Sequence, residues 1–399
     1  MTGVADAGRR GTLAAGQLTR ALVLVLAVIA GYVAVLTRDQ YLPERFLADG
    51  FLIRRIAQGL AAADQSYTNT ANVYAFFGLQ NHPEIAYVAG YTLAVIAFAV
   101  VWAQCRELPG GGWGVTILIG MGLMLSAIYL GYYSKDVFVL LCVLGVLLLR
   151  RSWWGGALLL ALLLGYGLVF RSYWVVVAVC FAGYWLIQPR LGRVGLFLTG
   201  AAVVGFGTLM ITVLLGVPGD EFRSRVNESR VGLDVGTIIT RFVELQEPLG
   251  GVVNNVLTYA ALIVPIPVLL IGGLYYLVIA LMFLALWVQF FRWVSPASDA
   301  PHGDGVLRRA VALIMAFVTV QALFEPDYGS ALRHLTPLLP LFVYVVWQSQ
   351  GRREMAALES DDVIAADDAS PRQRRARQRR ASAAVRRARG AAVSRASLR

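Results

Sequence analysis

Lysine, histidine and cysteine are all scarce in this chain, and each scarcity excludes a class of protein. Of the 35 basic residues among 399, Lys135 alone is a lysine and the others are arginines. The three histidines are dispersed, and the three cysteines lie in or beside apolar runs without a CxxC pair. Zinc sites and disulfide frameworks need closely spaced ligands or paired cysteines. We therefore expect no metal, no disulfide and no cofactor.

Charged residues of all kinds are also few, at 15% of the chain against 58% hydrophobic residues, with a mean hydropathy of +0.65. This composition excludes a large soluble domain. Repeated apolar runs of ~17–25 residues are typical of membrane-spanning helices. We expect an all-α, polytopic integral membrane protein with about ten transmembrane helices. The predicted spans are 19–37, 86–104, 113–132, 137–149, 154–170, 173–188, 193–216, 268–291, 306–323 and 332–349.

The first apolar run follows Arg9, Arg10 and Arg20, so it could be read as a signal peptide. No convincing cleavage site of small residues follows it, and we expect an uncleaved first span. Arginines then recur at the span ends of alternate loops, which is the positive-inside pattern of cytoplasmic loops. The arginines that we assign to the cytoplasmic side are Arg106, Arg150, Arg151, Arg190, Arg193, Arg292, Arg308, Arg309, Arg352 and Arg353. We expect both termini in the cytoplasm, with 1–18 as an N-terminal segment and 19–350 as the membrane domain.

The last segment, 351–399, is predicted to be a disordered basic cytoplasmic tail. It has eleven arginines from Arg372 onward among alanine and serine, with almost no large apolar residue to build a core. Such a stretch could indicate nucleic-acid binding. We favour contact with anionic membrane lipid beside the last span, and expect no nucleic-acid partner.

The stretch 256–294 is ambiguous, because its length fits either one span or two. Two spans would put the arginine-rich tail outside, which the charge rule disfavours. We prefer one span preceded by an interfacial or re-entrant segment at 256–267, where Pro265 and Pro267 break the helical hydrogen bonding.

On this topology the outer side carries two long loops, 38–85 and 217–255, and three short ones. The short loops hold YYSKD around Lys135 and Asp136, and FRSYW around Arg171. An ammonium and a guanidinium at helix mouths suit phosphate or carboxylate partners. The alternatives are a turn with an internal Lys–Asp pair and an interfacial arginine within an aromatic belt.

The densest polar cluster begins at Phe324 in the sequence FEPDYGSALRHLTPLLPLF, just before a proline-interrupted apolar segment. Ionisable groups at membrane depth are costly and usually functional. Glu325, Asp327 and His334 are candidate catalytic bases, and Arg333 is a candidate anion clamp. The alternative is a ring of ion pairs that closes the mouth of the helix.

Three further residues are candidate substrate-binding groups in the long loops. Arg223 and Arg230 lie seven residues apart, on one face if that stretch is helical. Asp49 precedes an amphipathic stretch at 51–60 that suits an interfacial helix. The alternatives are a solvated amphipathic helix for the arginines and a helix cap or ion pair for Asp49.

Several of these segments together resemble the Wzy-like polymerases of bacterial O-antigen, capsule and exopolysaccharide assembly, in their EpsG-like variety. The resembling pieces, in order over roughly 40–345, are LPERFLADGFLI with TNTANVY, YYSKDVFVL, FRSYW, RSRVNESR and the segment that begins FEPDYGSALRH. Some relatives carry an Arg/His-rich motif in a large outer loop, whereas 217–255 has arginines without histidine.

The resemblance implies a membrane glycosyltransferase similar to the GT-C type, in the bacterial plasma (inner) membrane. It would join undecaprenyl-pyrophosphate-linked oligosaccharide repeat units at the outer face, without metal, alongside other polysaccharide-assembly proteins. Lys135, Arg171 and Arg333 match the residue types that would bind pyrophosphate, and Glu325, Asp327 or His334 a base. The alternatives are a related transferase or ligase, a transporter or flippase of lipid-linked sugar, and a non-catalytic scaffold.

Overall fold

The structure is a computed structural model, and it describes residues 2–43, 46–62, 64–108, 111–150, 152–228, 237–271, 273–294 and 305–367, without the side chains of 2–15 and 358–367. Within these residues every named element is an α-helix or a 3₁₀-helix, and one isolated β-bridge joins Ile238 to Asp327. The prediction of an all-α protein is confirmed for the described part of the chain.

Six helical segments are long and apolar enough to cross a membrane. They are the Gly16–Gln40 part of α1 (Thr2–Thr37) with η1 (Arg38–Gln40), α4 (Pro83–Cys105), α9 (Arg193–Leu215), α13 (Leu274–Trp293), α14 (Gly305–Phe324), and the segment Tyr328–Ala357 of α15 (Tyr328–Leu335), η7 (Thr336–Leu338) and α16 (Leu339–Asp367).

Shorter apolar helices lie between them. These are α5 (Trp113–Tyr129), α6 (Val139–Leu148), α7 (Trp153–Val169), α8 (Tyr173–Ile187), α11 (Leu249–Ile263) and α12 (Ile266–Ile271). Each of the ten predicted spans therefore coincides with at least one helix, although the shorter helices do not meet the length of a full crossing.

The core is built around α14, whose residues are buried on almost every side. A helix that is apolar all round has no solvent-facing stripe, so it belongs inside a bundle. Its main partners are α8, α9 and α11. By contrast, α9 buries few of its residues, and its apolar outer face suits contact with lipid.

Several arginines close the C-terminal ends of helices by donating hydrogen bonds to their last carbonyl groups. Arg308 donates to Trp185 O at the end of α8 (2.8 Å), Arg309 to Leu149 O after α6 (2.8 Å), and Arg193 to Val294 O after α13 (3.0 Å). All three arginines were assigned from the sequence to the cytoplasmic side. A cation also interacts favourably with the negative end of the helix dipole.

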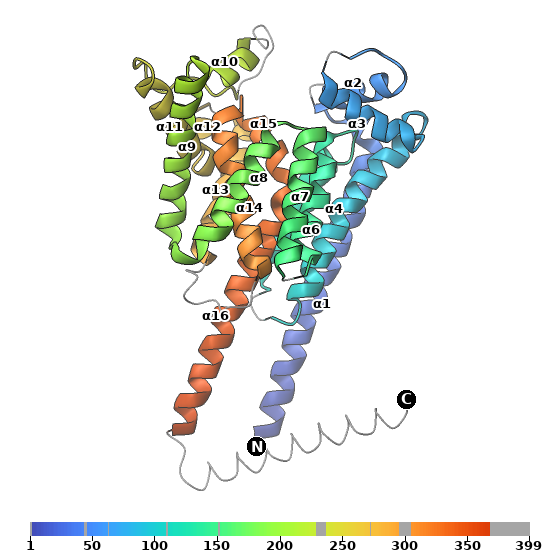
Figure 1. Cartoon of the computed structure of the whole chain (residues 1–399). Coiled ribbons are helices and arrows are strands. Elements are labelled where there is room, and N and C mark those ends of the chain that lie inside the picture. Colours follow the sequence, from blue (N-terminus) through green and yellow to red (C-terminus); the bar gives the residue numbers. More distant parts are fainter. Residues whose placement is uncertain are drawn as a thin grey trace. The chain divides into compact units, whose positions relative to one another are not determined.

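The opposite ends of the helices carry three smaller helices, α2 (Ala48–Ala57), α3 (Gln65–Phe76) and α10 (Glu221–Glu228), which lie with α15 toward the top of Figure 1. Arg38 at the end of α1 is fully buried there and donates to Gly131 O at the end of α5. Its guanidinium also lies 4.1 Å from the ring centroid of Tyr132. Gly50 brings α2 against the same ring, because a Cβ at this position would lie 1.6 Å from it.

The boundaries differ from the sequence prediction in two places. Helix α11 starts at Leu249, inside the predicted loop 217–255, and ends at Ile263 just before Pro265. The predicted span 268–291 begins in α12 and is broken at Gly273, whose φ of 86° suits glycine. The single long helix of this region is α13, preceded by α11, which packs against α9 and α14.

The described chain divides into two compact units, and the first, Met1–Glu107 with Gly111–Ser349, contains every helix up to the first part of α16. The second consists of Leu108–Gly110 and Gln350–Arg399, and its described part includes the last turns of α16 to Asp367. Residues 351–367, which we expected to be disordered, are therefore helical. The arginine-rich part of the predicted tail lies outside the described residues.

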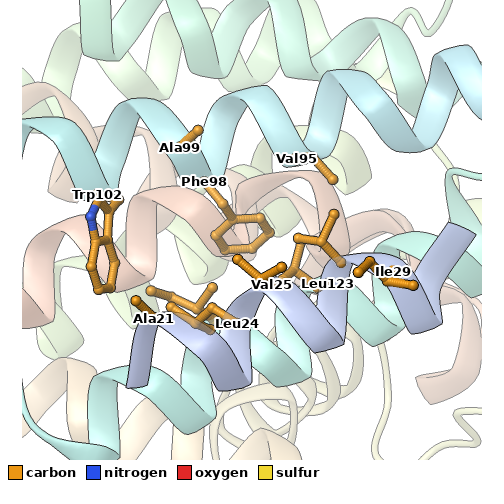
Figure 2. Close-up of a pocket in the computed structure, with 11 residues that line it drawn as sticks. Ala21, Leu24, Val25, Ile29, Val95, Phe98, Ala99, Trp102 and Leu123 are labelled. Carbon is orange, nitrogen blue, oxygen red and sulfur yellow. The ribbon is translucent and has the colours of Figure 1, made fainter. Parts of the chain in front are cut away.

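An apolar cavity of about 320 Å³ lies between α1, α4 and α5 (Figure 2). Val25 and Ile29 of α1, Phe98 and Trp102 of α4 and Leu123 of α5 face it. Two of these helices are candidate membrane spans. The cavity is thus lined by apolar side chains and lies beside two candidate membrane-spanning helices.

Candidate active site

Four of the predicted site residues come together around one buried carboxylate, that of Asp136. Asp136 is in η4 (Lys135–Phe138), a 3₁₀ turn that is capped by Ser134. The Ser134 side chain accepts a hydrogen bond from the Asp136 N–H. Arg171 Nη2, from the turn between α7 and α8, lies 3.0 Å from Asp136 Oδ1. Arg333 Nε, from α15, lies 3.3 Å from Asp136 Oδ2. Three separate turns and helix ends thus converge on one side chain that is 2% exposed.

Two guanidinium groups keep this carboxylate ionised. Burial opposes ionisation, but the charge of Arg171, together with those of Arg333 and Lys135, holds the pKa of Asp136 below its usual value. In return, the charge of Asp136 helps to hold the pKa of the Arg171 guanidinium well above its usual value despite burial. The Arg333–Asp136 pair is a charge-assisted hydrogen bond and the Arg171–Asp136 pair is an ion pair, both in a dehydrated setting.

Asp49 contacts the Arg333 guanidinium at a different nitrogen from the one that Asp136 contacts. Its Oδ2 lies 2.6 Å from Arg333 Nη1, and its Oδ1 accepts a hydrogen bond from Tyr67 OH at 2.9 Å. Burial of the Asp49 carboxyl opposes ionisation, but the Arg333 charge and the Tyr67 hydroxyl hold its pKa far below the usual range. Unlike that of Asp136, the Asp49 side chain is 36% exposed.

Lys135 belongs to the same cluster and contacts two side chains of α3. Its Nζ is 3.5 Å from the centroid of the Tyr67 ring and 3.1 Å from Ser66 Oγ, and the residue is only 7% exposed. Burial and the nearby Arg171 charge lower the pKa of Lys135 to about 8. The cluster therefore contains three cations, Lys135, Arg171 and Arg333, against two carboxylates.

A second group, Glu325 and His334, stands beside this cluster. His334 Nδ1 lies 2.9 Å from Glu325 Oε2, and Gln321 Nε2 donates to the same oxygen at 2.9 Å. Glu325 Oε1 is buried without a hydrogen-bond partner among the described residues. The carboxylate fixes the orientation of the imidazole, which directs Nε2 away from Glu325. Such a pair can accept a proton from a hydroxyl group.

Asp327, predicted as an alternative base, has a structural position. Its side chain caps α15 by accepting from Ser330 N (2.7 Å) and Ser330 Oγ (2.6 Å), and Thr237 Oγ1 donates to it at 3.3 Å. Backbone bonds from Ile239 N to Pro326 O and from Tyr328 N to Thr237 O attach the second long loop to the same helix end. The hydrogen bonds that hold Asp327 at the helix N-terminus make it a poorer base than the Glu325–His334 pair.

Arg223 also lies outside the cluster around Asp136. It is buried and donates to Thr258 Oγ1 (2.9 Å), Asn255 Oδ1 (2.8 Å) and Ala322 O (2.5 Å). Burial lowers the pKa of its guanidinium to about 10. These contacts join α10 to α11 and α14, so Arg223 holds the second loop in position. Arg230 lies outside the described residues.

Sequence reasoning missed three side chains that complete the site, namely Ser66, Tyr67 and Gln321. Ser66 and Tyr67 lie on α3, a helix that we did not predict because its sequence QSYTNT has neither apolar periodicity nor charge. The signal that could have found α3 is Asp64, whose side chain caps it by accepting from Ser66 N. Gln321 lies four residues before Glu325 in an apolar helix, and this spacing places both on one face.

Fold and site define this chain as an α-helical, multi-pass membrane protein with a buried ionic cluster at one end of its helices. Comparison with known protein families, with curated proteins and with solved structures found no match. Among the described residues, no group of three or more His, Cys, Asp and Glu side chains is arranged to hold a metal ion.

Proposed function

We propose that this protein is a membrane glycosyltransferase that polymerises oligosaccharide repeat units carried on undecaprenyl pyrophosphate. The observation that carries the proposal is the convergence of Lys135, Arg171 and Arg333 at one end of the bundle, beside the Glu325–His334 pair. The first three supply fixed positive charge for a diphosphate, and the last two supply a base.

Sugar transfer from a lipid pyrophosphate makes specific demands on an enzyme. The bond between the anomeric carbon of the growing chain and the pyrophosphate oxygen breaks, and the electron pair leaves with the lipid pyrophosphate. The hydroxyl oxygen of the incoming unit forms the new glycosidic bond, and its proton goes to a base. Preorganised cations in a dehydrated site stabilise the negative charge that develops on the leaving group.

The Glu325–His334 pair suits the proton transfer. With Nδ1 held by Glu325, the imidazole of His334 would take the proton of the acceptor hydroxyl at Nε2, and the Glu325 carboxylate would stabilise the imidazolium that forms. Gln321 fixes Glu325 in turn. This assignment gives His334 the catalytic role and makes Glu325 its positioning residue.

The apolar surroundings suit a polyprenyl substrate. The site groups lie at helix ends, so a diphosphate bound there would keep its hydrocarbon chain beside the spans, where the cavity between α1, α4 and α5 offers hydrocarbon-lined space. We assign the helices to ten spans with a GT-C-like arrangement, both termini in the cytoplasm of a bacterium and the site at the outer face of its inner membrane.

A reconstituted reaction tests this function. The purified full-length protein is placed in proteoliposomes with an undecaprenyl-pyrophosphate-linked repeat unit, and the products are separated by length. We expect a ladder of longer glycans, which Arg171→Lys and Arg333→Lys should each weaken strongly because an ammonium cannot replace a bidentate guanidinium. The matched control is Arg225→Lys, on the same side but exposed and paired only with Glu221 among the described residues.

Two results would reject the proposal. One is a wild-type protein that binds the lipid but yields no ladder from any repeat unit offered. The other is a ladder that persists in full when Arg171 and Arg333 are both replaced, because the proposed pyrophosphate site would then be dispensable.

Transport of the same lipid-linked sugar is a second candidate. Arg171, Asp136 and Arg333 compensate one another's charge inside the protein, and a path for a charged headgroup needs the same compensation. The proteoliposomes separate the two functions, because a flippase moves labelled lipid between leaflets without lengthening the glycan, whereas a polymerase or ligase forms a new glycosidic bond.

A further inference from the structure

The two carboxylates of the ionic cluster differ in a way that the proposed function leaves unexplained. Asp136 is 2% exposed and is held by Ser134 and by two arginines. Asp49 is 36% exposed, and its partners are Arg333 and the hydroxyl of Tyr67. Asp49 is the more exposed of the two and pairs with one arginine, whereas Asp136 pairs with two, so Asp49 is the carboxylate that can be displaced.

Asp49 also occupies a part of the Arg333 guanidinium that Asp136 leaves open. It takes one nitrogen of Arg333 while Asp136 takes another. The Tyr67 that binds Asp49 covers Lys135 with its ring, and Ser66 accepts from the same ammonium. Asp49, Ser66 and Tyr67 thus form a cover of neutral and anionic groups over the surface that an incoming anion must reach.

The charges favour an exchange of ligands at this surface. With Asp49 in place, three cations face two carboxylates, so the cluster has one net positive charge. Without Asp49, three cations face Asp136 alone, and the excess is two positive charges. A pyrophosphate that carries a sugar and a lipid as esters has one negative charge on each phosphorus, which this excess neutralises.

We propose that Asp49 is a placeholder for phosphate: its carboxylate occupies the position of one phosphate group on Arg333 and is displaced when a pyrophosphate binds. This inference rests on the proposed function, because it concerns the same anion site. It assigns Asp49 the role of an internal competitor, whereas the sequence had suggested a direct substrate contact. Affinity is lowered by the fraction of time that the competitor fills the site.

Inorganic pyrophosphate serves as the probe, with the full-length protein in nanodiscs and binding followed by calorimetry. Asp49→Asn removes the competing charge, and we expect pyrophosphate to bind about fivefold or more tightly than to the wild type. Tyr67→Phe changes no charge but frees Asp49 from its hydroxyl partner, and we expect a smaller gain in the same direction. Size-exclusion profiles and melting temperatures check that each variant is folded.

The matched control is Asp64→Asn, which removes the same charge close to Lys135. Asp64 caps α3 and contacts no arginine among the described residues, and asparagine caps helices as well as aspartate does. We expect its affinity to remain within about twofold of the wild type. An equal gain in Asp64→Asn and Asp49→Asn, with none in Tyr67→Phe, would show a simple charge effect and overturn the placeholder.

Lys135 provides a second readout, because as the only lysine it is the only side-chain amine that an acylating reagent can modify. Peptide mass spectrometry should show faster acylation in Asp49→Asn than in the wild type, and protection by pyrophosphate in both. Protection without any gain of affinity in Asp49→Asn would reject the placeholder and keep the anion site. Neither binding nor protection in any variant would reject the anion site of the proposed function, and the placeholder with it.

Discussion

At the scale of the residue, the site depends on how one buried carboxylate holds two guanidinium groups. Arg171 and Arg333 come from segments far apart in the chain, and Asp136 is the group that both contact. A buried ion pair adds little to stability compared with an apolar pair of the same volume, but removal of one member leaves an uncompensated charge. The ion pairs therefore serve to position the cations.

Replacement of Asp136 tests this role. Asp136→Asn should lower the free energy of unfolding by about 3–5 kcal/mol, because it leaves Arg171 and Arg333 without their shared buried counter-charge. Thermal unfolding in one detergent, compared with the wild type and with Asp64→Asn, measures the effect. An unchanged melting temperature in Asp136→Asn would mean that the pairs do not hold these helix ends together.

The Glu325–His334 pair makes a kinetic prediction. His334→Gln should reduce the rate of glycan extension by about 10²–10⁴-fold, because it removes the base. Glu325→Gln should have a smaller effect, since the imidazole loses its orientation and its counter-charge but remains present. Binding of the lipid-linked donor should change little in either variant, and a loss confined to donor binding would contradict the catalytic assignment.

Lys135 should give the site a dependence on pH. Its pKa is lowered to about 8, so the ammonium is present below that pH and is lost as the pH rises above it. We expect the affinity for pyrophosphate to fall about threefold to tenfold between pH 7 and pH 9, and the fall to be absent in Lys135→Arg, whose guanidinium stays protonated. A parallel fall in both proteins would trace the effect to another group.

At the scale of the element, the short helices at one end of the bundle are fixed by side-chain caps and buried amides. Asp327 caps α15, Asp64 caps α3, and Arg223 with Asn255 joins α10 to α11. At the opposite ends, arginines donate to the last carbonyls of α6 and α8. At both ends of the bundle, therefore, arginines hold helix ends in place through hydrogen bonds.

The capping role of Asp327 can be distinguished from a catalytic role by replacing one of its carboxylate oxygens with an amide nitrogen. Asp327→Asn keeps an oxygen for the Ser330 N–H, so stability and glycan extension should both stay close to the wild type. Asp327→Ala removes the cap and should cost about 1 kcal/mol. If a stably folded Asp327→Asn protein lost most of its glycan-extension activity, Asp327 would again be a candidate catalytic base.

Much of the helical pattern was predictable, because apolar runs are long and arginines mark their ends. The sequence also singled out Lys135, Arg171 and Arg333, since charge is rare in such a chain. It could not show that Asp49 and Asp136 share Arg333 through different nitrogens, because that geometry depends on how α2, η4 and α15 pack. The break between α12 and α13 was missed as well, because the glycine that makes it lies within a continuous apolar run.

At the scale of the whole molecule, the contacts agree with the grouping of helix ends by sequence. Gln104 donates to Leu147 O and Arg308 to Trp185 O, which joins loops assigned to the cytoplasm, whereas Arg333 meets Asp49 and Asp136 from loops assigned to the outside. The six long apolar helices account for part of the crossings. In the proposed ten-span topology, the other four crossings would be made by the shorter helices α5, α6, α7 and α8.

A reporter enzyme fused after Arg353 tests the proposed sidedness. We expect a cytoplasmic signal from this fusion and a periplasmic signal from a fusion within the loop 217–255, because the positive-inside rule places the arginine-rich ends in the cytoplasm. Opposite signals at both sites would invert the orientation, and equal signals would show an even number of crossings between them, whereas the proposed topology places three there, at 268–291, 306–323 and 332–349.

The burial of α14 on all sides has a consequence for biogenesis. Its partners α8, α9 and α11 all precede it in the chain, so each is already synthesised when the ribosome reaches residue 305. The central helix of the bundle is therefore synthesised after its neighbours, and it must pack between helices that have already been inserted into the bilayer. A nascent chain stopped before this point has its inner surfaces exposed to lipid, and we expect quality-control proteases to recognise it.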